Sequence, residues 1–208
     1  MDLSERQFLE PAAKLRTAEV VRAVERQTSV ELVVAVRRRA SHYVSVSLAF
    51  GALCALGGFL VMWFGETVYD VRTIPIDVAL AFVLGMALVA SVPALRRVLT
   101  PRALRLRGAE RAAHAAFAAL GIEKTSGRTG VLVYVVLFER TAVLVPDRGI
   151  PQALAAGPLA SIRALVALSV ERSDFEGFLT ALGRLGPACG AVLPRQANDE
   201  NELCDDVA

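Results

Sequence analysis

Two long apolar stretches dominate the hydrophobic pattern of the chain. The first runs from Tyr43 to Phe64 without a charged residue, and the second covers 76–95 with Asp77 as its only charge. About 20 helical residues cross the ~30 Å hydrocarbon core of a bilayer. Both stretches are apolar all round rather than along one stripe, which disfavours the alternative of two buried helices in a soluble protein. The pattern therefore predicts a transmembrane hairpin over residues 42–95.

The basic residues that flank this hairpin predict its orientation. Arg37, Arg38 and Arg39 precede the first stretch, and Arg96, Arg97, Arg102, Arg105 and Arg107 follow the second. The loop between the two stretches carries only Arg72 as a basic residue. Because basic residues are retained on the cytoplasmic side, both termini are expected in the cytoplasm.

The hairpin divides the remaining chain into two pieces with shorter periodic elements. In residues 1–41, the capping-box pattern Ser4–Gln7 predicts a helix to about Gln27, and Val30–Val36 reads as a buried strand. One helix and one strand bury too little surface to be stable alone. Residues 1–41 are therefore expected to be the first part of a domain that the hairpin interrupts.

Residues 96–193 supply the second part of that domain. Thr100-Pro101 predicts the start of a helix that continues to about Leu120, where Gly121 ends it. Val131–Phe138 and Thr141–Val145 read as two strands joined by a tight turn. Helices are expected over 152–170 and 175–193, with a second capping-box pattern, Ser173–Glu176, between them.

The two later strands need a third. They are apolar on both faces, and an isolated two-stranded hairpin is marginally stable. The missing strand is the one that precedes the first apolar stretch. The sequence thus predicts an α/β fold, a small sheet of three or more strands flanked by helices, interrupted by the transmembrane hairpin. This fold requires both pieces on the same side of the membrane, as the arginine distribution also indicates.

Composition excludes several classes of protein. Hydrophobic residues make up 54% and charged residues 21%, with a mean hydropathy of +0.48, which excludes a largely disordered chain. The net charge of +2, without basic surfaces that contain aromatic residues, disfavours nucleic acid as a partner. Cys54, Cys189 and Cys204 have no CxxC spacing and are too few for a disulfide framework.

The residues available for chemistry are few. His42 and His114 are the only histidines and lack ligand spacing, which disfavours a zinc site or a histidine-dependent triad. The loop Ser126–Gly130 feeds a strand, whereas phosphate-binding loops lead into a helix. No catalytic residue and no metal ligand is predicted. The candidates for binding a ligand are the polar residues of the loops beside the strands, and they are Glu31, Arg128, Thr129, Asp147 and Arg148.

Two of these candidates raise the question of acid–base chemistry. Glu31 and Asp147 are close in one strand register and at opposite ends of the strands in another. They could act as base and acid only if they converge beside a pocket. The alternative is local: Asp147 shapes a turn, and Glu31 caps or pairs nearby.

The chain resembles the TPM domain family. The stretches that carry the resemblance are TSVELVVAV and FAALGIEKTSGRTGVLVYVVLFERTAVLVPDRGI. The chain is most similar to the bacterial membrane branch, in which two spans split the domain. The ending LPRQANDENELCDDV is similar to that branch's terminal pattern, with Cys204 where proline is usual. The resemblance implies helices around a small sheet, an inner-membrane location, and either acid phosphatase activity with a divalent cation or a role in assembling membrane complexes.

One departure from the family pattern bears on activity. Where the proposed metal-binding members carry acidic and amide residues, this chain has Ser126-Gly127-Arg128-Thr129-Gly130. An arginine repels a divalent cation, which needs several oxygen ligands.

The expected function is therefore a non-catalytic binding or assembly module, with the bilayer and a membrane protein or a second copy as partners and without a cofactor. The alternative is a phosphomonoester hydrolase that uses Mg²⁺ or Ca²⁺. A channel or transporter is disfavoured because the two spans lack intramembrane charges.

The last 15 residues form a separate segment. Residues 194–208 carry five acidic side chains against one arginine. The segment is expected either to be a solvated acidic tail or to dock, on the basic residues beside the membrane spans or on a partner.

Overall fold

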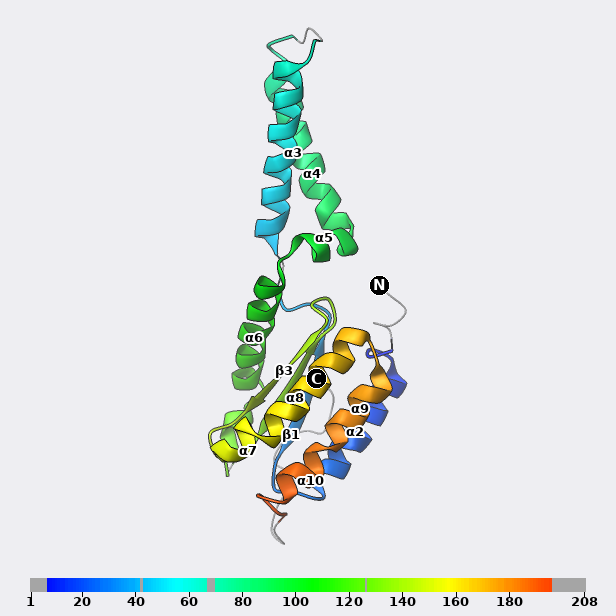
Figure 1. The fold of residues 1–208 in the computed structure, drawn as a ribbon, viewed down its shortest axis with the longest axis vertical. Coiled ribbons are helices and arrows are strands. Elements are labelled where there is room, and N and C mark those ends of the chain that lie inside the picture. Colours follow the sequence, from blue (N-terminus) through cyan, green and yellow to red (C-terminus); the bar gives the residue numbers. More distant parts are fainter. Residues whose placement is uncertain (1–6, 42, 67–69, 126, 196–208) are drawn as a thin grey trace. The chain divides into compact units, whose positions relative to one another are not determined.

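The protein consists of two compact units (Figure 1). The computed structural model describes residues 7–41, 43–66, 70–125 and 127–195. One unit joins Met1–Ser41 to Leu106–Ala208, and the other is His42–Arg105. Two sequence-based predictions rest on residues outside the described ranges: the first three residues of the capping box that begins at Ser4, and the acidic tail beyond Arg195.

The first unit is built on a mixed three-stranded sheet. β1 (Leu32–Arg37) runs parallel to β2 (Val131–Val136), which pairs antiparallel with β3 (Thr141–Pro146). The strand order is β1-β2-β3, so the strand that precedes the hairpin lies beside β2. The predicted α/β fold, completed by the early strand, is confirmed.

Helices cover both faces of this sheet, because each strand has apolar side chains on both of its faces. On one face, Leu32, Val34, Val131 and Val133 join a core with α2 (Pro11–Glu25), α8 (Pro158–Arg172) and α9 (Phe175–Gly183). On the other face, Val33, Ala35 and Leu132 pack with α6 (Arg102–Ala119). Small residues on α6, Ala109 and Ala113, are fully buried there and allow the helix to approach the strands closely. Figure 1 shows α2, α8 and α9 together and α6 apart from them.

Two predicted helices are each broken in the structure. The predicted helix 152–170 is α7 (Gln152–Ala156) followed by α8, and the predicted helix 175–193 is α9 followed by α10 (Leu185–Gly190). Pro158 is the first residue of α8 and Pro187 lies in the first turn of α10. Proline has no amide hydrogen to continue the preceding helix, which explains both breaks.

The second capping-box prediction assigned the wrong residue. Ser173 adopts a left-handed conformation (φ 57°) and ends α8. Asp174 is the N-cap of α9 instead, and its Oδ1 accepts a hydrogen bond of 2.9 Å from the Gly177 amide. The side chain of Glu176 therefore does not pair with Ser173 as the capping-box pattern implied.

The early helix boundaries also differ from the predictions. The Thr100 hydroxyl donates to the carbonyl of Arg96 at 2.6 Å, and α6 begins at Arg102. Gly121, with φ of 68°, follows the end of α6 as predicted and precedes a short 3₁₀ turn, η1 (Ile122–Lys124). The strand predicted to reach Phe138 ends at Val136. The next four residues form the turn into β3, in which the Arg140 amide donates to the carbonyl of Leu137.

The second unit contains two long apolar helices. α3 (Val44–Phe64) and α4 (Ile74–Ser91) are both long and apolar enough to cross a membrane. The second ends earlier than the predicted residue 95, and α5 (Pro93–Leu99) follows it. Val92 is extended (φ −110°, ψ 97°) because helical geometry is disfavoured for a residue before proline.

A third segment, Gln152–Arg172, also meets the length and composition of a span. It differs from α3 and α4 because it is divided into α7 and α8 and lies against the sheet. Leu159, Ile162 and Val166 on its inner face are at most 5% exposed and fill the core. Removing α8 from this position would uncover β3 on that face of the sheet, whereas α2 would still cover β1.

Candidate functional site

The five predicted ligand-binding residues lie at one edge of the sheet. Glu31 precedes β1, Arg128 and Thr129 precede β2, and Asp147 and Arg148 follow β3. β1 and β2 are parallel and β3 is antiparallel to them, so these three strand ends meet at the same edge. The register aligns Leu32, Val131 and Pro146, which places Glu31 and Asp147 on either side of Gly130.

Backbone hydrogen bonds extend the sheet by one residue at this edge. The Val131 amide donates to the carbonyl of Glu31 at 2.8 Å, and the Asp147 amide donates to the carbonyl of Gly130 at 2.8 Å. The Gly149 amide donates to the carbonyl of Arg128 at 2.9 Å. The loop before β2 is therefore fixed to the turn after β3.

Several polar groups of the edge stabilise these loops. The Thr129 hydroxyl donates to the carbonyl of Ser29 at 3.0 Å. Asp147 Oδ1 accepts from the Arg148 amide at 2.7 Å, which holds the turn that follows β3. Asp147 Oδ2 is buried and accepts no hydrogen bond from the residues that the structure describes. The side chains of Arg128 and Arg148 are exposed.

Glu31 and Asp147 do not form a carboxylate pair. Two strand spacings separate their backbones, which is about 9.5 Å. Ile122, which is fully buried, lies over Gly130 between them: a Cβ at Gly130 would come within 2.3 Å of Ile122 Cγ2. Sharing one proton or bridging one ion requires carboxylates a few ångströms apart. Asp147 shapes its turn, as the local interpretation of the sequence expected.

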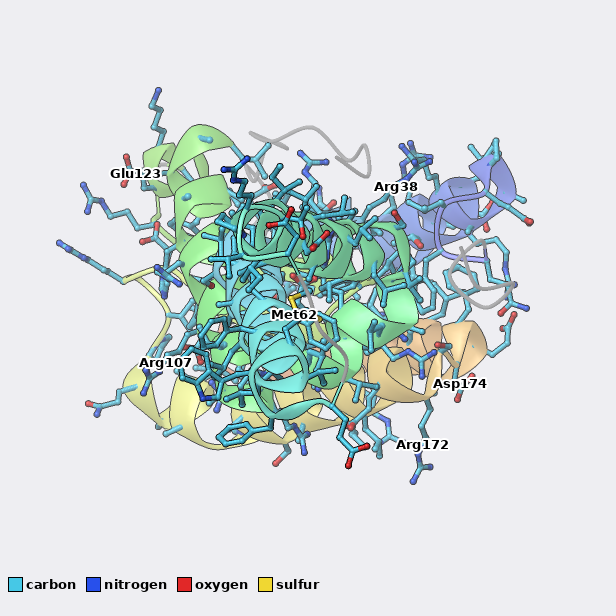
Figure 2. The ribbon with its side chains drawn as sticks, turned by 90° about the horizontal axis from the view of Figure 1, so that it is seen from above. Arg38, Met62, Arg107, Glu123, Arg172 and Asp174 are labelled. Carbon is cyan, nitrogen blue, oxygen red and sulfur yellow. The ribbon has the colours of Figure 1, made fainter. Side chains whose placement is uncertain are left out.

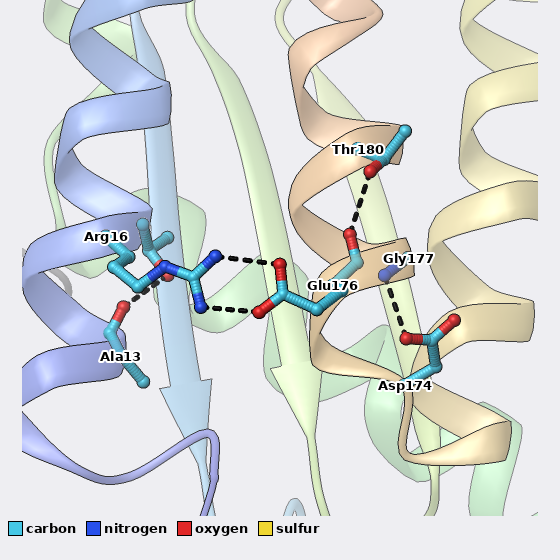
Figure 3. Close-up of polar contacts among 7 residues, drawn as sticks. Ala13, Arg16, Asp174, Glu176, Gly177 and Thr180 are labelled. Carbon is cyan, nitrogen blue, oxygen red and sulfur yellow. Dashed lines mark hydrogen bonds and ion pairs between the residues drawn. The ribbon is translucent and has the colours of Figure 1, made fainter.

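A second polar region, which sequence reasoning missed, lies between α2 and α9 (Figure 3). Arg16 on α2 donates two hydrogen bonds to Glu176 on α9, of 2.5 Å and 2.7 Å. The Arg16 guanidinium also lies 5.5 Å from the centre of the Phe175 ring. The pair borders an open groove of about 360 Å³ that also includes Gln7, Glu10 and Asp174.

This ion pair changes the titration of both partners. The hydrogen bonds from Arg16 hold the pKa of Glu176 below its usual range, and Glu176 raises the pKa of Arg16. The two residues are 160 positions apart in the sequence, so no local spacing could have revealed the contact. The pair joins a helix that precedes the hairpin to one that follows it.

A third region is the groove between α8 and α9, of about 260 Å³. Leu165 and Leu168 line it from α8, and Thr180 and Ala181 line it from α9. Arg172 and Arg184 stand at its rim, and Figure 2 shows Arg172 extending away from the ribbon near Asp174. The continuous apolar run over α8 was the sequence signal for this surface, because such a helix has an apolar outer face as well as an inner one.

The remaining candidate groups have structural surroundings. Cys189 is fully buried on α10, and burial raises the pKa of its thiol to about 11. Burial also raises the pKa of Tyr134 on β2. Glu139 is buried in the β2–β3 turn, where its Oε1 accepts from the Ala40 amide at 3.0 Å.

The acidic, histidine and cysteine side chains do not lie close enough together to bind a metal ion in the part of the chain that the structure describes. Within residues 7–41, 43–66, 70–125 and 127–195, no three His, Cys, Asp or Glu side chains gather as a metal site would require. His114 is exposed on α6. Arg128 and Arg148, in the loops beside Asp147, carry positive charges, which favour an anion and disfavour a divalent cation.

Comparison with known proteins gives a likeness of fold. No protein-family model and no curated protein matches the chain. The NMR structure of the BA42 protein from the psychrophilic bacterium Bizionia argentinensis is similar, with a TM-score of 0.57 and 17% sequence identity. The match covers 97% of this chain and 94% of that one. At this identity the likeness concerns the fold alone.

Proposed function

We propose that this chain is a membrane-anchored, non-catalytic binding or assembly module of the TPM domain type, held at the cytoplasmic face of a bacterial inner membrane. The observation that carries the proposal is the use of the polar groups at the sheet edge. The Thr129 hydroxyl, the Arg128 carbonyl and Asp147 Oδ1 all hold the two loops in place. A rigid edge of this kind suits a scaffold that presents surfaces.

The anchor follows from α3 and α4. Most of their large side chains are exposed and apolar, Leu53, Leu56 and Leu84 among them. Such a surface is unstable in water and stable in lipid. Eight arginines flank the hairpin on the side of the first unit against Arg72 in the connecting loop, which supports a cytoplasmic location of both termini.

The membership proposal has two supports of different kinds. The sequence resemblance covers nearly the whole chain, from TSVELVVAV to the acidic ending. The three-stranded sheet with helices on both faces agrees with the architecture that this resemblance implies. A membrane-protein partner or a second copy is the expected binding partner.

Photo-crosslinking in native membranes tests the binding proposal. A photoreactive residue replaces Leu15 on α2, His114 on α6 or Leu168 on α8, which are exposed positions on three helices of the first unit. The proposal expects the same discrete adduct to recur from one of these faces and not from the other two. Diffuse labelling that is equal from all three positions would contradict it.

A phosphomonoester hydrolase remains the alternative, and Asp147 Oδ2 favours it. This buried oxygen has no hydrogen-bond donor among the described residues, so it could accept a hydrogen bond from a ligand. The detergent-solubilised chain would be assayed with Mg²⁺, Mn²⁺ or Ca²⁺. Turnover that is present in the wild type and lost in both Asp147→Asn and Arg128→Ala would support the enzyme and overturn our preference. Turnover at background in all three proteins is the result that a non-catalytic module predicts.

A further inference from the structure

The outer face of α8 has an apolar surface that the core of the first unit does not explain. Leu159, Ile162, Val166 and Val170 point into the core, whereas Leu165 and Leu168 point outward and are 36% and 41% exposed. Leu165, Leu168 and Arg172 are spaced three and four residues apart, so they form one strip along the helix. This strip is one wall of the groove between α8 and α9.

The rim of this groove is positively charged. Arg172 and Arg184 are exposed, and neither has a carboxylate within 4 Å among the described residues. Asp174, which also borders the groove, uses Oδ1 to cap α9. The groove therefore suits a short segment that combines a leucine-sized side chain with several carboxylates.

The chain itself carries a segment of this composition. Residues 196–208 contain five acidic side chains and no basic one, and Leu203, Cys204 and Val207 are the larger apolar residues among them. The residues just before this segment are held near the C-terminal end of α2, a helix that covers the same face of the sheet as α8 and α9. Arg195 donates to the carbonyl of Glu25 at 3.0 Å, and the Leu193 carbonyl accepts from the Thr28 hydroxyl at 2.7 Å.

The length of the segment allows it to reach the groove. Arg184 is joined to Gly190 by α10, a rise of about 9 Å, and five further residues span at most about 18 Å to Arg195. The nine residues from 196 to 204 can extend about 30 Å. This reach exceeds the ~27 Å that at most separates Arg195 from Arg184, so the extended segment can bring Cys204 to the Arg184 end of the groove that Leu168 also lines.

We propose that the C-terminal segment 196–208 binds in cis to the groove between α8 and α9, with its apolar residues on Leu165 and Leu168 and its carboxylates beside Arg172 and Arg184. The segment then covers the apolar outer face of α8. An acidic partner that used the same groove would have to displace it. This inference does not depend on the proposed function, because it concerns two parts of one chain.

Disulfide trapping with the native Cys204 tests the proposal in the full-length protein. Leu168→Cys is made in a Cys54→Ala background, and buried Cys189 is retained. Leu15→Cys is the matched control, since it is 68% exposed on α2, with α9 between α2 and α8 (Figure 3). The proposal expects an intramolecular disulfide between positions 168 and 204 in at least fivefold higher yield than between positions 15 and 204. Thr180→Cys, on the opposite wall of the groove, replaces Leu168→Cys if that variant does not fold.

The dependence of the disulfide yield on charge and on salt distinguishes a specific contact from random collision. The yield should fall at least threefold in 1 M NaCl and in the Arg172→Glu, Arg184→Glu double variant, and the Arg172→Lys, Arg184→Lys variant should retain it. Equal yields at positions 168 and 15 would overturn the proposal. A disulfide that links two chains, detected as a dimer on a non-reducing gel, would overturn binding in cis.

Discussion

At the scale of single residues, close backbone contacts decide much of the sheet edge. A Cβ at Gly149 would lie 2.4 Å from the carbonyl oxygen of Gly127 and 2.5 Å from that of Arg128. Both are backbone atoms, which cannot move away without breaking the hydrogen bond that joins the two loops. Gly149 is thus required for the close approach of these two loops.

Gly149→Ala is expected to destabilise the first unit by about 1–3 kcal/mol, the usual cost of inserting a methyl group where no space exists. Gly183→Ala is the control, because a Cβ at Gly183 meets nothing within 4 Å. The control should keep or slightly raise stability, since alanine is the better helix former. Denaturant unfolding followed by circular dichroism measures both. Equal unfolding midpoints would contradict the contact.

The Cys189 thiol provides a second prediction at this scale. Burial raises its pKa to about 11, so at pH 8 its thiolate fraction is more than a hundredfold below that of an ordinary thiol with a pKa of about 8.5. In a Cys54→Ala, Cys204→Ser background, labelling with a thiol reagent should be slow in the native state and fast in denaturant. The native rate should still rise between pH 9 and pH 10. Rapid native labelling at pH 8 would show that Cys189 is not buried.

At the scale of elements, the sequence predicted which segments form helices and strands better than where they end. The β2–β3 hairpin and its need for a third strand followed from the apolar runs, because an isolated hairpin is marginally stable. The parallel pairing of β1 with β2 did not follow from them. The ends at Ser91, Ala156 and Gly183 differ from the predictions because each precedes a proline by at most four residues, and proline removes a helical hydrogen bond. The contact of Arg16 with Glu176 depends on the packing of α2 on α9, which no local pattern encodes.

The pH dependence of that contact can be measured. The pKa of Glu176 is lowered in the folded state, so its contribution is present above the ordinary carboxyl pKa of about 4.3 and is lost as the pH falls through the folded-state value. Wild type should therefore melt slightly above Glu176→Gln at pH 6, and the two should converge near pH 3. Both side chains are exposed, so the difference should be small and should shrink in high salt.

Glu110→Gln is the control for this comparison. Glu110 is exposed on α6, and no ion pair within 4 Å joins it to another described residue. Its melting temperature should follow the wild type throughout the pH range. A difference between wild type and Glu176→Gln that persists unchanged at pH 3 would contradict an ionic contact.

The packing of α3 on α4 yields a prediction for the second unit. Gly85 approaches Cys54 so closely that a Cβ at position 85 would be 2.9 Å from the Cys54 Cβ. A disulfide needs about 3.8 Å between these atoms, so a shift of about 1 Å would accommodate one. Gly85→Cys should form an intramolecular disulfide with native Cys54 under mild oxidation, detected by mass spectrometry as the loss of two hydrogens.

Gly57→Cys serves as the matched control within the same pair of helices. A Cβ at Gly57 meets nothing within 4 Å, so this thiol should remain reduced and reactive. If the Gly85→Cys thiol and Cys54 both remain reactive after oxidation, α3 and α4 do not cross at these residues.

At the scale of the whole molecule, the parallel pairing of β1 with β2 constrains the path of the chain. The two strands belong to one sheet, and α3 and α4 lie between them in the sequence. If these helices cross a bilayer, they must do so an even number of times. The sequence predicted that the early strand joins the two later ones in one sheet, because a lone strand needs a partner. It could not predict that Ile122 separates Glu31 from Asp147, which depends on the register and on the turn η1.

The central proposal is that α3 and α4 each cross the membrane once, so that both parts of the sheet lie on its cytoplasmic side. Single cysteines at Leu15, Glu66 and Arg148, in a background without Cys54, Cys189 and Cys204, can be probed with a membrane-impermeant maleimide on intact spheroplasts. We predict that position 66 is labelled directly and that positions 15 and 148 are labelled only after permeabilisation. Labelling of positions 15 and 148 from opposite sides, or of all three from the same side, would contradict the account.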